Sequence, residues 1–365
     1  MKIAKAETIA IKVPFSFGGQ PFGWGGKVWN TNDILLVRVE TDTGIVGWGE
    51  AFCYACLEAT RAAVDHMIAP MVVGRDAGDI AGISRHLQQG LHLQGRYGIT
   101  IFAISGLDIA LWDIAGKAAG LPVHRLLCGA GRTELPAYAS LFKYRNAEHV
   151  AARTRMALDQ GYKYIKLHET TEPEVRAARE AAGGGIPIMV DTNCPWTPEE
   201  ARHMTRRLMA YDIHWLEEPI FPPEDFLSLA RLRREEGVAL AAGENACTAM
   251  EFAQMLRAEA VDYVQPSVTK VGGISEFQKV AALADAAGVT VMPHSPYFGP
   301  GFLATLQLAA ARAVPGGLIE RFHLDLEATL YGKLIDPVNG FFKVPQEPGL
   351  GPAPDPDVIK TYRVK

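Results

Sequence analysis

A lysine and a histidine lie two positions apart at the end of a short apolar run, in YIKLHET at residues 164–170. If this run is a strand, alternation places Lys166 and His168 on one face and Ile165 and Leu167 on the other. An ammonium group beside an imidazole can neutralise an anion and can also take up or release a proton. A strand that ends at the surface can carry both residues without any function. The residues at the other strand ends must therefore show whether this pair belongs to a functional site.

Polar or ionisable residues occupy the ends of the next six runs as well. Successive positions are separated by 23 to 27 residues, the length of one strand, one helix and their connections. The set comprises Lys166 and His168, then Asp191, Glu217, Glu244, Ser267, His294 and Glu320. One such residue could be an ordinary solvated loop charge, but polar residues at seven consecutive strand ends indicate a single functional site.

Three carboxylates in this set end successive runs, and they are expected within a few ångströms of one another. Alone, Asp191, Glu217 and Glu244 would repel one another and raise their pKa values, so a divalent cation is the natural compensation. Three oxygen donors with room for water and substrate suit Mg²⁺. The sequence therefore predicts a Mg²⁺ site at these three residues.

Candidate acids and bases are expected on two sides of this metal site. Lys166 and His168 lie to one side of it, and His294 lies on the far side. Bases on opposite faces of a metal-bound carboxylate suggest that the proton next to that carboxylate is removed. Charge then builds on the carboxylate oxygens as an enediolate, which a metal and a lysine can stabilise. The predicted substrate is therefore a small-molecule carboxylate.

Eight short β-like runs alternate with helical segments from residue 135 onward, and these elements must position the site. The runs are 135–141, 162–168, 186–191, 213–218, 238–244, 261–267, 289–294 and 317–322. Strand, helix and strand repeated in this way predict parallel pairing with right-handed crossovers, and eight strands close a (β/α)8 barrel. Active sites of such barrels lie at the carboxyl ends of the strands, where the constellation falls.

The first 130 residues have a different pattern, which predicts a small antiparallel sheet followed by helices. Asp42-Thr43-Gly44 is predicted to be a turn between two strands, and residues 58–74 and 99–120 have helical apolar spacing. We therefore predict an α+β accessory domain at 1–130 and a barrel domain at 131–330. The segment 331–365 is rich in Pro and Gly and is predicted to pack back on the first domain.

Composition narrows the class of protein. A chain of 365 residues with 48% hydrophobic residues can build a large core, and its formal net charge of −5 argues against a nucleic-acid binder. The five cysteines are few, odd in number and dispersed, which favours a reducing compartment. No run approaches ~18 apolar residues, and the first residues lack the apolar core of a signal peptide. A soluble, cytoplasmic protein without a membrane partner is expected.

Several motifs, in order, resemble the enolase superfamily of the mandelate racemase and muconate-lactonizing type. They are GWGEA (47–51), SGLDIALWDIAGKAAGLPVHRLL (105–127), VDTN (190–193), WLEEP (215–219), GEN (243–245), KVGGISE (270–276) and PHS (293–295). The resemblance covers essentially the whole chain. It implies a modified TIM-like barrel, an N-terminal capping domain completed by the C-terminal tail, Mg²⁺ at the three carboxylates, and a homo-oligomer.

The resemblance also implies roles for two substrate-binding residues. Asn193 matches a position that often contacts the substrate. Glu320 matches a glutamate that can hydrogen-bond the substrate carboxylate, and it would have to be protonated to donate that bond. The alternative is a glutamate at the barrel end that pairs with Arg321 or with a lysine.

Two positions depart from the family pattern. The second barrel strand usually carries Lys-x-Lys, but here it reads Lys166-Leu167-His168. Either His168 is the base and Lys166 neutralises the substrate carboxylate, or Lys166 is the base and His168 assists. The related enzymes carry an aspartate or a lysine at the position of Ser267, and the aspartate supports the histidine that matches His294. Without it, His294 is in doubt as a base, and a role as proton donor remains possible.

A lid is suggested by residues 16–30, where five glycines alternate with aromatic residues. The glycines lack the spacing and context of a dinucleotide site. We expect a flap that closes over the substrate, with Phe22, Trp24 and Trp29 as candidate substrate contacts. Plain packing of these aromatic residues is the alternative.

The same chemistry serves several reactions. Acid and base groups on both faces favour a sugar-acid or hydroxy-acid dehydratase, in which the α-proton and the β-hydroxyl leave. A racemase or epimerase is the alternative, and a cycloisomerase is the third. A non-catalytic binding protein is a remote possibility, and the intact carboxylate set argues against it.

Overall fold

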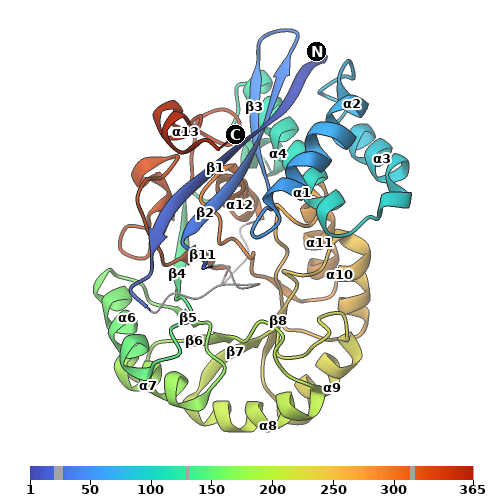
Figure 1. Ribbon diagram of the computed structural model, residues 1–365. Helices are drawn as coiled ribbons and strands as arrows, with labels where there is room; N and C mark the ends of the chain where they lie inside the picture. Colours follow the sequence, from blue (N-terminus) through green and yellow to red (C-terminus); the bar gives the residue numbers. More distant parts are fainter. Residues whose placement is uncertain (20–27, 129–130, 313–316, 365) are drawn as a thin grey trace.

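The computed structural model describes residues 1–19, 28–128, 131–312 and 317–364, and Figure 1 shows a small sheet with helices set against a barrel. The small sheet has the order β12-β1-β2-β3 and is antiparallel throughout. Its strands are β1 (Ile3–Ser16), β2 (Thr31–Thr41), β3 (Val46–Ala51) and β12 (Asp325–Leu326). The predicted turn at residues 42–44 joins β2 to β3.

Helices cover one side of this capping sheet. They are α1 (Leu57–Ala62), a π-helical turn (Ala63–Ile68), α2 (Ala69–Val72), α3 (Ile80–Gly90) and α4 (Ile99–Ala119). Helix α4 packs tightly on β3, because a Cβ at Gly47 or Gly49 would lie about 2 Å from backbone oxygens of α4. Both helical segments expected from the apolar spacing are therefore present, and the first contains a π-helical turn that the spacing did not indicate.

Helix α4 is long and apolar enough to cross a membrane by length and composition alone. However, 78% of its most apolar window is buried inside the protein. Ile101, Ile104, Leu107 and Leu111 pack in the core of the capping domain. The apolar character of α4 therefore reflects a core helix.

All eight strands expected after residue 135 are present and parallel. They are β4 (Glu134–Ser140), β5 (Ile165–Leu167), β6 (Ile188–Asp191), β7 (Ile213–Glu217), β8 (Leu240–Ala242), β9 (Tyr263–Val264), β10 (Thr290–Val291) and β11 (Ile319–Phe322). Their order is β10-β9-β8-β7-β6-β5-β4-β11. Among the described residues no backbone ladder joins β10 to β11, so the barrel is a modified one.

A helix follows most strands and covers the outside of the barrel (Figure 1). These helices are α6 (Ala147–Asp159), α7 (Glu172–Ala182), α8 (Pro198–Leu208), α9 (Phe226–Glu236), α10 (Thr248–Arg257), α11 (Gly273–Ala286) and α12 (Pro300–Arg312), and α5 (Val123–Cys128) precedes β4. Local sequence sets their starts. Thr197 and Glu200 form a capping box on α8, and Asn146 and Asp225 cap α6 and α9.

A separate apolar cluster closes the inside of the barrel below its mouth. Tyr138, Met189 and Trp215 come from β4, β6 and β7, Met292 directly follows β10, and all four are almost fully buried. The indole of Trp215 donates a hydrogen bond to Glu217 Oε2 at 2.9 Å. The floor of the barrel thereby fixes one of the carboxylates at its mouth.

The C-terminal segment contacts both domains. Strand β12 joins the capping sheet through β1, and the backbone N–H of Val364 donates to Ala10 O at 2.9 Å. Helix α13 (Pro356–Tyr362) lies beside β1 (Figure 1). Strand β13 (Phe341–Lys343) instead pairs antiparallel with β4 of the barrel. Residues 331–365 thus contact the capping domain as expected, and they also extend the barrel sheet, which the sequence did not indicate. Strand β12 lies earlier, inside the range 131–330 predicted for the barrel domain, so the chain joins the capping sheet before the predicted boundary.

Candidate active site

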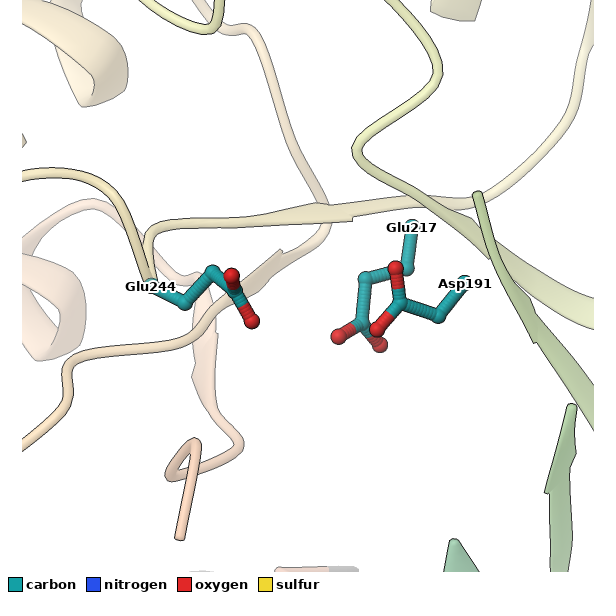
Figure 2. Close-up of side chains that lie close together, drawn as sticks. All are labelled: Asp191, Glu217 and Glu244. Atoms are coloured by element: carbon teal, nitrogen blue, oxygen red, sulfur yellow. The ribbon is translucent and has the colours of Figure 1, made fainter. Parts of the chain in front are cut away.

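Three carboxylates meet at the mouth of the barrel. Asp191 and Glu217 are the last residues of β6 and β7, and Glu244 follows β8 by two residues. Each offers one oxygen, and these oxygens all lie within 4.8 Å of one another. Figure 2 shows the carboxylates of Asp191 and Glu217 side by side, with Glu244 directed toward them. The residues predicted as metal ligands thus form a divalent-metal site.

Electrostatic repulsion within this group supports that assignment. Burial, and then the charge of Asp191, raise the pKa of Glu217 to about 8. Burial raises the pKa of Asp191 as well, but Lys166 and His168 outweigh burial and lower it, and His294 likewise lowers the pKa of Glu244 to about 2. Two carboxylates that stay ionised beside a third that resists ionisation are suited to a bound cation. The donor set, which consists of oxygens only, fits a hard divalent ion.

Lys166 lies directly beneath this group and is completely buried. Its Nζ lies 2.9 Å from Glu217 Oε1, 3.1 Å from Asp191 Oδ2 and 3.1 Å from Glu320 Oε1. Burial lowers the pKa of Lys166, but these carboxylates outweigh burial and raise the pKa well above its usual value. Lys166 is therefore a fixed positive charge in this arrangement.

His168 is oriented by the strand next to its own. Its Nδ1 lies 2.6 Å from the carbonyl oxygen of Leu141, so the N–H on Nδ1 donates and Nε2 faces the site. Nε2 lies 3.2 Å from Asp191 Oδ2. Burial lowers the pKa of His168, but the charge of Asp191 outweighs burial and the net shift is upward. Lys166 and His168 thus face the same carboxylate, as strand alternation predicted.

His294 approaches from the opposite side, three residues beyond β10. Its Nε2 lies 2.7 Å from Glu244 Oε2, and its Nδ1 lies 3.4 Å from the hydroxyl of Ser267. That hydroxyl is also hydrogen-bonded to the hydroxyl of Tyr297. A neutral pair of hydroxyls therefore occupies the position where related enzymes were expected to place an aspartate or a lysine.

The two predicted substrate-binding residues at the barrel mouth are both held by hydrogen bonds. The backbone N–H and the side-chain amide of Asn193 donate to Asp191 Oδ1 at 3.0 and 2.9 Å. Glu320 accepts from Ser140 Oγ at 2.7 Å and from the N–H of Ser295 at 2.9 Å. Burial raises the pKa of Glu320, but Lys166 and these hydrogen bonds lower it overall. Glu320 is thus an anion paired with a lysine, and the idea of a protonated donor is not favoured.

A cavity of about 450 Å³ opens above these residues. One wall is aromatic and combines residues of both domains, namely Trp29, Phe52, Tyr54, Phe142 and Phe322. The polar residues that line it are Lys143, His168, Asn193, Glu244, Lys270, His294 and Glu320. Lys166 is absent from this lining. The size of the cavity suits a small metabolite.

The predicted lid, residues 16–30, lies only partly within the described residues. Trp29 lines the cavity, and its indole N–H donates to Thr31 O at 2.9 Å. Its ring lies 5.4 Å from that of Phe142 and 5.7 Å from that of Tyr54. Phe22 and Trp24 lie outside the described residues.

The sequence did not single out several residues that line the cavity. Lys143 follows the end of the first barrel run by two positions, so extending the strand-end rule to that run would have found it. The sequence offered Lys270 either as a cation near the site or as a surface lysine, and it lines the cavity with only 6% of its surface exposed. Phe52 and Tyr54 come from the capping domain, and no local pattern places them at the barrel mouth.

Comparisons with known proteins agree with this arrangement. Residues 9–128 match the N-terminal domain of mandelate racemase / muconate lactonizing enzyme, and residues 149–358 match the enolase C-terminal domain-like family. Arabinonate dehydratase of Saccharolobus solfataricus is 34% identical over 343 residues, 91% of each chain. D-galactarolactone cycloisomerase of Agrobacterium fabrum is 34% identical over 364 residues, 94% of this chain and 95% of its own.

Solved structures are similar over the whole chain. A member of the enolase superfamily from a Polaromonas species has a TM-score of 0.88 at 32% identity, covering 100% of this chain and 98% of its own. A racemase from Streptomyces coelicolor with bound magnesium has a TM-score of 0.86 at 28% identity, covering 99% of this chain and 100% of its own. The chain therefore belongs to the mandelate racemase and muconate lactonizing enzyme family, and it is an enzyme of the enolase superfamily.

Proposed function

We propose that the protein is a Mg²⁺-dependent dehydratase that removes the α-proton and the β-hydroxyl of a sugar acid or another hydroxy acid. The observation that carries this proposal is that two histidines line one cavity beside different members of the carboxylate cluster, His168 beside Asp191 and His294 beside Glu244. Relatives named as arabinonate, D-xylonate and D-galactonate dehydratases, at 34%, 31% and 30% identity, support it.

The choice of Mg²⁺ follows from the donor set. Asp191, Glu217 and Glu244 supply three carboxylate oxygens and leave coordination positions for water and substrate, as Mg²⁺ prefers. Two similar solved structures carry bound magnesium. When bound, the ion would polarise the substrate carboxylate and offset the charge that develops on it.

Access to the cavity supports His168 as the base on its face. His168 lines the cavity, whereas Lys166 is completely buried and does not. The hydrogen bond from Nδ1 to Leu141 O leaves Nε2 as the only ring atom of His168 that can accept a substrate proton. Lys166, held by three carboxylates, instead supplies positive charge beneath the reacting carboxylate.

Proton donation on the opposite face is assigned to His294. Its Nε2 faces the cavity beside Glu244, and its Nδ1 is supported by Ser267, which hydrogen-bonds Tyr297. The hydroxyl of Ser267 holds the ring from its Nδ1 side, so Nε2 is the atom directed at the cavity, where it could protonate a leaving hydroxyl.

Cycloisomerisation is the second candidate. D-galactarolactone cycloisomerase is as similar to this chain as arabinonate dehydratase is, over slightly more of the chain. The same proton abstraction begins both reactions, and the departing group distinguishes them.

The test is incubation with Mg²⁺ in D₂O against a panel of sugar acids, their lactones and simpler hydroxy acids. We expect α-deuterium exchange together with loss of water, and both should disappear on chelation of the metal or in Asp191→Asn. Exchange that leads to an epimer or a ring-opened isomer without loss of water would replace the dehydratase assignment. Absence of exchange and turnover with every compound would contradict the enzyme proposal.

A further inference from the structure

Lys143 lines the active-site cavity from the loop that follows β4. Two residues earlier, the carbonyl of Leu141 accepts the hydrogen bond that orients His168. Lys143 therefore belongs to the His168 wall of the cavity. It is half-buried, as is the metal ligand Glu244, which lines the same cavity, whereas Asp191 and Glu217 are at most 1% exposed and do not line it.

The loop that carries Lys143 is fixed by a buried carboxylate. Oε1 of Glu169 accepts the backbone N–H of Tyr144 at 2.6 Å and that of Arg145 at 3.1 Å. Glu169 is 2% exposed and directly follows His168 in the sequence. One carboxylate thus ties the loop of Lys143 to the strand end that carries His168, and the two side chains keep a fixed relation.

The charge of Lys143 has no ion-pair partner. No carboxylate of the described residues lies within 4.0 Å of its Nζ, although Lys166 has three such partners. Glu169, the acid whose charge acts most strongly on Lys143, uses its oxygens on backbone N–H groups. Burial lowers the pKa of Lys143, against the opposing effect of Glu169. A half-buried ammonium without a partner is costly unless a ligand supplies one.

The other charged groups of the cavity are already engaged. Glu244 faces His294, and Glu320 is held by Lys166 and Ser140. Lys270 also has no carboxylate of the described residues within 4.0 Å, but its Nζ lies 3.4 Å from the amide oxygen of Asn245 and 4.8 Å above the ring of Phe52. Lys143 is therefore the cation among the described lining residues that is left for a substrate group remote from the reacting carbon.

We propose that Lys143 binds a second carboxylate at the far end of the substrate, so that the enzyme acts on a hydroxylated dicarboxylic acid in preference to the matching monocarboxylic acid. This inference rests on the proposed function, because it assumes that the first carboxylate lies at the metal site. A hydroxyl group in place of the second carboxylate leaves the ammonium without a counter-charge and is bound more weakly.

The experiment uses pairs of six-carbon sugar acids that share a configuration and differ only in a terminal hydroxymethyl or carboxylate group. We expect the wild-type enzyme to favour the diacid by about 100-fold in kcat/KM. Lys143→Met should lower the diacid value by about 100-fold and change the monoacid value by less than about 3-fold. Lys143→Arg should retain most of the preference. The control is Lys163→Met, at an exposed position before the opposite end of β5.

A preference of the wild-type enzyme for the monoacid, or an equal loss on both substrates in Lys143→Met, would overturn the inference and leave the proposed function intact. Calorimetric measurement of the binding of the same pairs, in the presence of Mg²⁺, tests the carboxylate subsite independently of turnover. If neither compound reacts but diacid affinity still falls in Lys143→Met, the proposed function fails and the carboxylate subsite stands. Equal affinity of Lys143→Met and wild type for the diacid, or no binding to either protein, overturns the subsite.

Discussion

The imidazole of His168 is held in one orientation by a single backbone carbonyl. Because Nδ1 donates to Leu141 O at 2.6 Å, Nε2 is the nitrogen directed at Asp191 and the cavity. Lys166, two residues earlier, is directed into the carboxylates beneath it. The sequence predicted that the two side chains share a face, but it left open which one takes the proton. Access to the cavity favours His168.

His168→Asn is expected to lower kcat for proton removal by about 10²- to 10⁴-fold, the usual contribution of a positioned base. Asparagine keeps a polar group near Leu141 O but cannot take up a proton. The measurement is α-deuterium exchange in D₂O, with the affinity for Mg²⁺ as a check that the carboxylates are unchanged. His294→Asn is the matched comparison, since it should abolish loss of water but not exchange on the His168 face. Unchanged exchange in His168→Asn would assign the base elsewhere.

Some residues of the site could be predicted from the sequence and others could not. The spacing of Asp191, Glu217 and Glu244 was enough to predict the metal site, because parallel strands bring their carboxyl ends together whatever lies between them. The partners of Asn193 could not be predicted, because its two hydrogen bonds to Asp191 depend on a left-handed backbone conformation, with φ of 54°. Lys143 was missed because the rule that polar residues at strand ends form the site was not applied to the first barrel run, which Lys143 follows by two positions.

At the scale of elements, carboxylates of the capping domain meet the starts of barrel helices. Glu50 at the end of β3 accepts the N–H of Gly301 in the first turn of α12 at 2.8 Å. Asp108 of α4 accepts the N–H of Ser275 in the first turn of α11 at 3.0 Å. Each contact satisfies a backbone donor that a helix leaves unpaired at its start. The two domains are thus joined by specific polar contacts at the starts of two barrel helices.

Glu50 makes the stability of this contact depend on pH. Burial raises its pKa to about 8, although the hydrogen bonds from Gly301 and Gly299 lower it. A carboxyl group whose pKa is higher in the folded state contributes stability that is complete below about pH 4.5 and is lost as the pH rises toward 8. We expect Glu50→Gln to reduce the fall in the free energy of unfolding between pH 5 and pH 9 by on the order of a few kcal/mol.

The measurement for Glu50 is urea denaturation at several pH values. Glu199→Gln is the control, because Glu199 lies at the start of α8 with 76% of its side chain exposed. Its pH dependence should match the wild type. Parallel curves for wild type and Glu50→Gln would show that this carboxyl does not carry the effect.

Elements differed in how far the sequence could predict them. The eight barrel strands followed from apolar runs at regular intervals, even where the structure keeps only two residues of a strand, as in β9 and β10. The opening between β10 and β11 and the pairing of β13 with β4 were not predicted. Both depend on contacts between distant segments, which leave no local period in the sequence.

At the scale of the whole molecule, the cavity exists only where the two domains meet. Its acid and base groups come from barrel strand ends, whereas Trp29, Phe52 and Tyr54 come from the capping domain. The hydroxyl of Tyr54 donates to the carbonyl of Pro296 at 2.7 Å, two residues after His294. This bond links the capping domain to the loop that carries the proposed proton donor.

Loss of that bond should affect substrate capture more than the chemical step. In Tyr54→Phe the aromatic ring stays in the wall, but the carbonyl of Pro296 loses a donor worth about 1 kcal/mol. We expect kcat/KM to fall about 5-fold, mostly through a higher KM, while Mg²⁺ affinity is unchanged. Tyr263→Phe is the matched control, since Tyr263 begins β9 at the far end of the barrel from the mouth. If Tyr54→Phe lowers kcat as strongly as His294→Asn and leaves KM unaltered, the hydroxyl acts on His294 itself, and domain contact is not its role.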